Sequence, residues 1–284
     1  MTQTILTLSC PDAHGIVATV CGFLAERDCN IVQSAQFGDE SSGLFFMRVV
    51  FSGPAGNEAA RKALTDAFTP IAQRFKMAWQ VHDAHERPRV LLLVSKFGHC
   101  LNDLLFRWSS GLLPIDIPVI ASNHTDFQPL AHSYRIPFLY LPVTPETREQ
   151  QEARLLELVE RERIDLVVLA RYMQILSNDL CEKLRGKAIN IHHSFLPSFK
   201  GAKPYHQAHH RGVKLIGATA HYVTPDLDEG PIIEQDVARV DHSMDPAALA
   251  ATGHDVECQV LARAVKWHVE RRVLLNGDRT IIFR

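Results

Sequence analysis

The sequence lacks any apolar run of the roughly 18 to 20 residues needed to cross a bilayer. It also has little net charge, because 30 Lys and Arg residues against 32 Asp and Glu residues give a formal charge of −2. That balance argues against broad electrostatic binding to nucleic acid or to an anionic membrane surface. Residues 1–6 carry neither a basic segment nor a long apolar one, so we expect no signal peptide and a cytoplasmic protein.

The cysteines show no pairing pattern, and none of the six forms a C-x-x-C pair. Scattered cysteines without a framework are typical of reduced thiols in a cytoplasmic protein. Internal repeats and low-complexity segments are absent as well. With 46% hydrophobic and 22% charged residues over 284 positions, the chain has the ordinary composition of one large or two unequal globular domains.

The pattern of apolar residues changes near residue 82, which predicts two domains. Before that point, alternating apolar residues predict strands, and apolar residues three or four apart predict helices. The predicted order is strand 3–9, helix from Ile16, strands 30–37 and 44–51, helix 60–75 and strand 77–81. This β-α-β-β-α-β order is the ferredoxin-like arrangement. The polar segment 83–88, which ends in proline, is predicted to be a linker.

A different pattern occupies residues 89–284, where strands that are apolar on both faces alternate with helical segments such as 146–163. This alternation predicts a Rossmann-like α/β domain with a mostly parallel sheet. Two further strands, a long helix and a hairpin at Asn276-Gly277 are predicted to complete it. The predicted strands are 90–94, 119–121, 138–141, 166–170, 188–191, 216–223 and 232–240.

Polar residues that suit acyl chemistry gather where one of these strands ends. Asn190 and His192 are two apart, so they share a strand face, and Asp228 lies in the loop 224–231. An Asn amide can stabilise an oxyanion, a His can move a proton, and a carboxylate can support the charged ring. Taken alone, these residue types are weak evidence, because an N-x-H at a strand end is more often a polar strand terminus and an Asp in such a loop more often forms a turn.

A longer sequence motif favours the catalytic interpretation of these residues. Segments 190–197, 217–224 and 227–231, within about residues 88–284, resemble the signature of the folate-dependent formyltransferase family, including the spacing of 36 residues between His192 and Asp228. The resemblance implies that Asn190, His192 and Asp228 are catalytic. The family usually has proline at the position of His193, and we favour His192 because it shares the Asn190 face. By the same resemblance, the folate is bound by Met173, Gln174, Ile175, Leu176, His221, Thr224 and Leu227.

The acceptor of the formyl group is suggested by a loop that has little glycine. In relatives that hold a ribose phosphate, a Gly-rich loop after the first strand of this domain meets the phosphate. Here the segment 95–101 keeps one glycine among bulky residues, so water becomes the expected acceptor. The hydrolysis would need no cofactor, since the folate is the substrate itself.

The N-terminal domain also favours hydrolysis of a formyl folate. Pro11-Asp12-x-x-Gly15 and Asn30-Ile31 resemble the ACT family of amino-acid-sensing domains. An ACT domain joined to a formyltransferase-like domain resembles the formyltetrahydrofolate deformylase family. The resemblance implies hydrolysis of 10-formyltetrahydrofolate to formate and tetrahydrofolate, with a role in one-carbon balance and formate supply for purine synthesis. It also implies a homo-oligomer and an amino-acid effector, glycine or methionine, near Asp12, His14, Gly15, Asn30 and Ile31.

Two alternatives remain open from the sequence. One is a formyltransferase with an undisclosed amine acceptor, and the other is a non-catalytic sensor of amino acids and folate. Three histidines at 206, 209 and 210 could suggest a metal, but a solvated helix face is expected and no metal is predicted. Lys200, Lys203 and Tyr205 are equally compatible with the folate tail and with a solvated loop.

Overall fold

The computed structural model describes residues 3–53, 58–196 and 204–284, which fall into two compact units. Unit 1 runs to Glu86 and includes Glu270–Asn276 and Thr280–Arg284, whereas unit 2 comprises Arg87–Val269 and Gly277–Arg279. The sequence-based division instead gave the C-terminal residues to the second domain. The exact domain borders and the linker 83–88 remain predictions.

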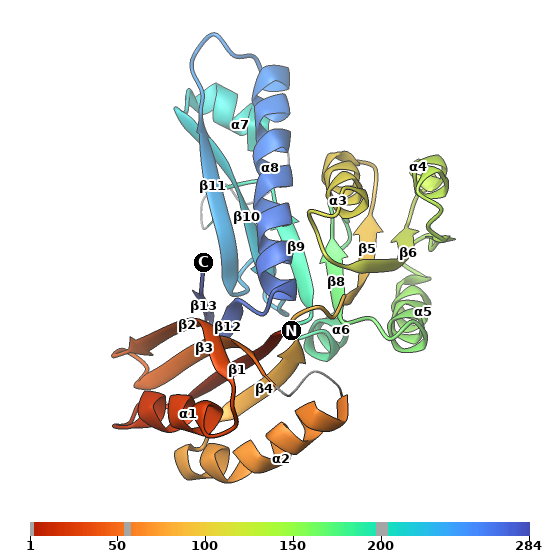
Figure 1. The fold of residues 1–284 in the computed structure, drawn as a ribbon. Coiled ribbons are helices and arrows are strands. Elements are labelled where there is room, and N and C mark those ends of the chain that lie inside the picture. The colour runs from red at the N-terminus through yellow and green to blue at the C-terminus, as the bar shows by residue number, and fades with distance from the viewer. Residues whose placement is uncertain (1–2, 54–57, 197–203) are drawn as a thin grey trace. The chain divides into compact units, whose positions relative to one another are not determined.

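Unit 1 is a four-stranded antiparallel sheet in the order β2-β3-β1-β4, with two helices on one face (Figure 1). The predicted β-α-β-β-α-β arrangement is therefore confirmed. Its elements are β1 Gln3–Pro11, α1 Ile16–Ala25, β2 Asn30–Asp39, β3 Leu44–Ser52, α2 Glu58–Phe75 and β4 Ala78–Asp83.

The two faces of this sheet have different cover because side chains alternate along each strand. Met47 and Val49 face the helices and pack with Phe68 in one apolar core. Arg48, which lies between them, is 5% exposed and points to the other face. Its guanidinium donates to the carbonyl oxygens of Glu270 and Arg271, at 3.0 and 3.1 Å. C-terminal residues thus supply backbone acceptors for a cation of the N-terminal sheet.

Unit 2 contains a seven-stranded sheet in the order β11-β10-β9-β8-β5-β6-β7. The five strands from β9 to β7 are parallel, β10 is antiparallel to β9, and β11 is antiparallel to β10. The predicted mostly parallel sheet is confirmed. The strands are β5 Arg89–Val94, β6 Asp116–Ser122, β7 Phe138–Tyr140, β8 Leu166–Leu169, β9 Ala188–His192, β10 Leu215–Tyr222 and β11 Ile232–Arg239.

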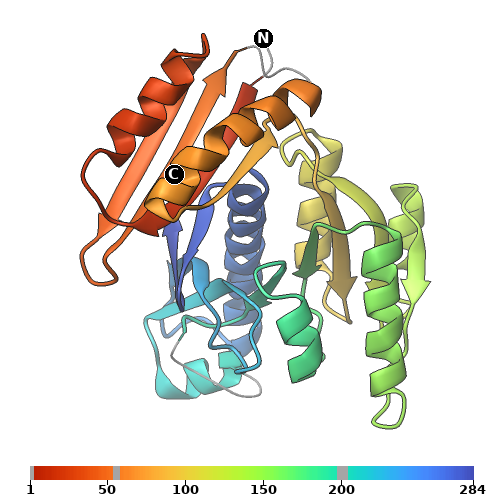
Figure 2. The ribbon, with the colours of Figure 1, turned by 90° about the horizontal axis from the view of Figure 1, so that it is seen from below.

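Helices cover both faces of the parallel strands (Figures 1 and 2). α3 and α8 pack together on one face, whereas α5 and α6 share an apolar core with Leu91 and Leu169 on the other. None of the helices in the described part of the chain is long and apolar enough to cross a membrane. The helices are α3 His99–Ser109, α4 Gln128–Ser133, α5 Arg148–Arg161, α6 Asn178–Lys183, α7 Pro204–Arg211 and α8 Pro246–Val269.

The chain closes with the hairpin of β12 Val273–Asn276 and β13 Arg279–Ile282. Gly277, the first of the two turn residues, has a φ of 62°, a conformation that favours glycine. The amide of Asn276 donates to Asp39 Oδ2 at 2.7 Å. The predicted closing hairpin is present, and its two turn residues are Gly277 and Asp278, because Asn276 still belongs to β12.

Candidate active site

Two of the predicted catalytic residues lie on one face of β9. Asn190 and His192 alternate along this strand, so both side chains leave the sheet on the same side. The neighbouring β10 runs antiparallel and places His221 directly opposite Asn190. Asn190 Nδ2 lies 3.3 Å from His221 Nε2. Pairing of β9 with β10 therefore brings a third polar side chain to the site.

The ring of His221 is held in one orientation by its own backbone. Its Nδ1 lies 2.9 Å from the carbonyl oxygen of Tyr222, which can only accept, so Nδ1 carries the proton of the neutral ring. Nε2 is then an acceptor and takes a hydrogen bond from the Asn190 amide. One N–H of Asn190 is used in this way, and the second can donate to a ligand oxygen.

Asp228 reaches the site from the loop between β10 and β11. Its φ of 58° is unusual for a residue other than glycine and turns the loop back toward the sheet. A Cβ at Gly230 would overlap the Tyr222 carbonyl, so this close approach requires glycine. As a result, Asp228 Oδ2 lies 3.2 Å from His192 Nδ1, and Oδ1 lies 3.7 Å from His221 Nε2.

The charges of the Asp228–His192 pair follow from these contacts. Burial raises the pKa of Asp228, but its contacts with the His192 and His221 rings outweigh burial and hold the pKa well below its usual range. Asp228 is therefore a carboxylate, and His192 Nδ1 donates to it. The other ring nitrogen, His192 Nε2, is buried and has no hydrogen-bond partner among the described residues. It is the nitrogen available for proton transfer.

The adjacent His193 has a different environment. Its ring stacks on that of His192 with centroids 5.0 Å apart and planes at 30°. Burial, the Arg171 charge and His192 together lower the pKa of His193 to about 4. His193 is therefore neutral near pH 7, and the contact with Asp228 belongs to His192. This difference supports the choice of His192 as the base.

A cavity of about 400 Å³ opens beside these residues and is lined by Asn190, His192, His193 and Asp228. Two segments form its walls, one after β8 and one after β10. Met173, Ile175 and Leu227 in these segments are exposed and apolar, which suits a flat aromatic ligand. Every residue predicted from the sequence to bind the folate lines this cavity: Met173, Gln174, Ile175, Leu176, His221, Thr224 and Leu227.

The predicted effector residues do not come together within one chain. Strand register places Asp12, His14 and Gly15 beyond the end of β1 that pairs with Leu44. Asn30 pairs with Ser52, at the opposite end of the sheet. The two groups are about 25–30 Å apart at about 3.3 Å per strand residue. A single effector site that uses both groups needs a second copy of the chain.

Several minor sequence interpretations have clear outcomes. His206, His209 and His210 are exposed on α7, as expected for a solvated helix face. Lys200 and Lys203 lie outside the described residues. Tyr205 does not contact the folate cavity and instead donates to Glu257.

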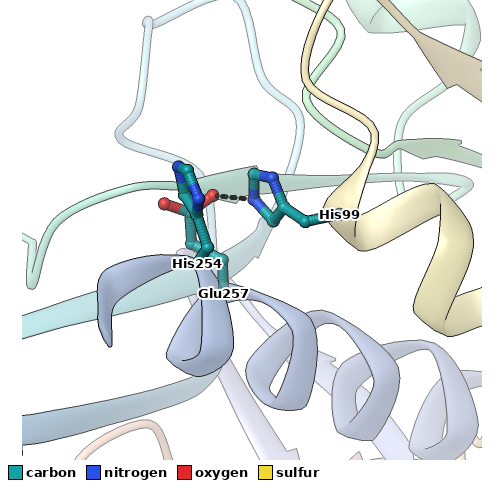
Figure 3. A group of neighbouring side chains, drawn as sticks. All are labelled: His99, His254 and Glu257. Atoms are coloured by element: carbon teal, nitrogen blue, oxygen red, sulfur yellow. Dashed lines mark hydrogen bonds and ion pairs between the residues drawn. The ribbon is translucent and has the colours of Figure 1, made fainter. Parts of the chain in front are cut away.

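The structure adds a buried polar group that the sequence reasoning missed. Glu257 is fully buried on α8 and accepts a hydrogen bond from His99 Nε2 at 2.7 Å (Figure 3). Arg171 Nε lies 3.3 Å from the same carboxylate. The sequence could have indicated that Glu257 is buried, because it lies one helical turn from Gly253 and from Leu261, on the buried side of α8.

His99, His254 and Glu257 are also close enough to be considered as metal ligands (Figure 3). However, the two imidazoles stack face to face, with centroids 4.0 Å apart and planes at 17°. Ring-nitrogen lone pairs lie in the ring plane, so stacked rings do not both point at an ion between them. The guanidinium of Arg171 beside Glu257 further disfavours a cation. We therefore treat the group as a hydrogen-bonded network.

Comparisons with known proteins agree with this geometry. A formyl transferase family model matches residues 88–265, and an ACT domain model matches residues 4–69. A formyltetrahydrofolate deformylase from a Corynebacterium species is 52% identical over 99% of this chain and 98% of its own length. The crystal structure of a formyltetrahydrofolate deformylase from Burkholderia mallei, 57% identical, superposes with a TM-score of 0.96 and covers 100% of both chains. The formyltetrahydrofolate deformylase of Bacillus subtilis is 48% identical in sequence over 98% of this chain and 93% of its own length.

Proposed function

Because the chain belongs to the formyltetrahydrofolate deformylase family, we propose that its site hydrolyses 10-formyltetrahydrofolate to formate and tetrahydrofolate. One observation carries the assignment of roles. His192 contacts the Asp228 carboxylate through Nδ1 and lines the cavity together with Asn190. Its Nε2 has no hydrogen-bond partner in the part of the chain that the structure describes. A base, its supporting carboxylate and an oxyanion donor therefore surround one space.

In the first step, a water molecule attacks the formyl carbon. His192 Nε2 takes one proton from the water as the new C–O bond forms, and Asp228 stabilises the resulting imidazolium. Negative charge collects on the formyl oxygen of the tetrahedral intermediate. The free N–H of Asn190 donates to that oxygen, an effect worth about 3–4 kcal/mol in known oxyanion holes.

In the second step, the imidazolium of His192 returns its proton to N10 of the folate. The C–N bond then breaks, its electron pair stays on nitrogen, and tetrahydrofolate leaves. The carbonyl of formic acid re-forms, and the acid releases a proton to solvent as formate. All atoms are accounted for by the folate, water and the three side chains, so the reaction needs no cofactor. Formate supply for purine synthesis would follow from its release.

A simple assay tests the choice of water as acceptor. The chain is incubated with 10-formyltetrahydrofolate alone, and formate and tetrahydrofolate are measured together. Equal amounts of both products, with no added amine, are expected. Product formation that depends on an added amine would point to a formyltransferase instead. Folate binding without turnover under any condition would point to a non-catalytic sensor.

The ACT domain supports a regulatory proposal. We propose that glycine or methionine binds near Asp12 and Gly15 in a homo-oligomer, because Asn30 lies at the far end of the sheet. Calorimetry with each amino acid and light scattering of the native chain test this proposal. Heat on binding and a mass above one chain are expected. The nearly balanced charge and the similarity to bacterial deformylases also support a cytoplasmic location.

A further inference from the structure

One wall of the folate cavity is an irregular segment, residues 171–177, that lies between β8 and α6. It carries Met173 and Ile175, whose side chains are 52% and 63% exposed. Exposed apolar side chains gain free energy when they collapse onto an apolar core, and backbone outside helices and strands needs hydrogen-bond partners from elsewhere. The open shape of this wall therefore depends on groups outside the segment.

The first half of the wall is fastened to the end of β5. Ser95 N donates to the Arg171 carbonyl oxygen at 3.2 Å, and Met173 N donates to Ser95 Oγ at 3.0 Å. The Ser95 hydroxyl in turn donates to Asn123 Oδ1, just after β6, at 2.7 Å. Its one proton is thus used, and its lone pairs are left to accept from the wall.

The second half of the wall is fastened by α5, none of whose residues lines the cavity. Arg148 Nη2 donates to the Ile175 carbonyl oxygen at 2.7 Å. Glu152 accepts from the backbone N–H of Ser177 at 2.8 Å and from the hydroxyl of the same residue. Two side chains of one helix therefore hold the main chain of the wall at positions 175 and 177.

Arg148 and Glu152 also support each other. They are one helical turn apart, and Arg148 Nε lies 3.5 Å from Glu152 Oε1. The Glu152 side chain is only 10% exposed, so its charge needs these donors, whereas Arg148 is half-exposed. Ser177 is the N-cap of α6, and its Oγ accepts from Leu180 N at 3.3 Å. The pair thus fixes the point at which the wall ends and α6 begins.

A further contact from α5 anchors the wall to the core. Gln151 Nε2 donates to the Tyr172 hydroxyl at 2.9 Å, and both side chains are buried. The Tyr172 ring packs in the same apolar core as Leu169. Tyr172 is therefore held in the core while the adjacent Met173 stays exposed.

We propose that Arg148 and Glu152 are positioning residues for substrate binding, which set the affinity for the folate by holding residues 175–177 in the shape that binds it. The inference rests on the proposed function, because the wall is the surface on which the folate would lie. The three catalytic side chains come from β9 and from the loop after β10, so other elements hold them. Loosening the wall should therefore weaken binding and leave the chemical step nearly unchanged.

Arg148→Leu removes the donor to the Ile175 carbonyl and keeps a helix-forming residue. If one further residue must then be ordered on binding, KM should rise about tenfold. The kcat value should stay within about threefold. Arg148→Lys keeps a donor and should recover part of the affinity. Arg154→Leu makes the same change at an exposed position of α5 and is the matched control.

Two variants test the other half of the pair. Glu152→Gln offers one acceptor oxygen in place of two, and Ser177→Ala removes the hydroxyl that Glu152 binds. Both should raise KM with little change in kcat. Ser177→Ala keeps the test valid if Glu152→Gln does not fold. A KM within twofold of wild type in Arg148→Leu and in Ser177→Ala would overturn the proposal, as would a loss confined to kcat.

Calorimetry with tetrahydrofolate tests the same role without turnover. The dissociation constant should be about tenfold weaker for Arg148→Leu than for wild type and unchanged for Arg154→Leu. Urea unfolding of the same variants separates positioning from a purely structural role. A lower urea midpoint for Arg148→Leu, together with a tetrahydrofolate affinity equal to that of wild type, would overturn the proposal.

Failure of the proposed hydrolysis has a different signature from failure of this role. If the hydrolysis fails, the wild type releases no formate but still binds tetrahydrofolate more tightly than Arg148→Leu does. If the positioning role fails, the wild type releases formate and the two proteins bind tetrahydrofolate equally. A wild type that does not bind tetrahydrofolate would overturn both.

Discussion

Asp228 Oδ2 lies 3.2 Å from Nδ1 of His192, although 36 positions separate the two residues in the sequence. The adjacent His193, stacked on the same ring, is placed against Tyr205 and under the influence of Arg171 instead. Two neighbouring histidines thus have different partners. Because His192 contacts the Asp228 carboxylate, His192 is the ring that can hold a proton during the reaction.

Asp228→Asn keeps the size of the side chain and removes its charge. The imidazolium of His192 then loses its stabilising partner, so we expect kcat to fall by about 10²–10⁴-fold. Formate release at saturating substrate measures the effect. Asp226→Asn, in the same loop, serves as the control and should stay close to wild type. Equal activity of the two variants would contradict the role of Asp228.

Asn190→Ala removes the donor to the oxyanion. The developing charge on the formyl oxygen is then left without this hydrogen bond, and kcat should fall by about 10²–10³-fold. KM should change little, because the bond strengthens only as charge develops. Steady-state kinetics with His209→Gln, on the exposed face of α7, as a control tests this expectation. A large rise in KM with unchanged kcat would instead assign Asn190 to substrate binding.

Much of this site could be predicted from the sequence, because strand alternation and loop chemistry are local. Asn190 and His192 share a face because side chains alternate along a strand. The segment after β8 could be placed at the site because it follows the end of a predicted strand. Glu257 could not be assigned a role, since its partners His99 and Tyr205 come from separate helices. Nor did the sequence show that the Glu270 and Arg271 carbonyls pair with Arg48. Contacts of this kind depend on tertiary packing, which no local period encodes.

Arg48→Met should destabilise unit 1. The substitution removes this donor from the partly buried carbonyl oxygens of Glu270 and Arg271, at a cost of about 1–3 kcal/mol. Urea unfolding followed by fluorescence measures the change in free energy. Lys62→Met is the control, because that side chain is 75% exposed and its surface ion pair with Asp66 should contribute well under 1 kcal/mol. Equal stability of the two variants would contradict the packing.

The stability of unit 1 should also depend on pH through His82. Burial and the Arg271 charge lower the pKa of His82 to about 4, from an ordinary value of 6.5. Between these values the unfolded chain binds the proton more readily, so stability is lost as pH falls from about 6.5 to 4. His82→Gln should therefore lose less stability than wild type between pH 7 and pH 5. Urea midpoints at the two pH values test this, and identical losses would contradict it.

Isotope labelling in H₂¹⁸O tests the central claim most directly, namely that water attacks the formyl carbon at the site of His192, Asn190 and Asp228. Single turnover of 10-formyltetrahydrofolate with excess chain should give formate that carries at least one ¹⁸O atom. His192→Ala should give almost none on the same timescale while keeping its fold. Formate without ¹⁸O, or labelled formate at a wild-type rate from His192→Ala, would contradict the account.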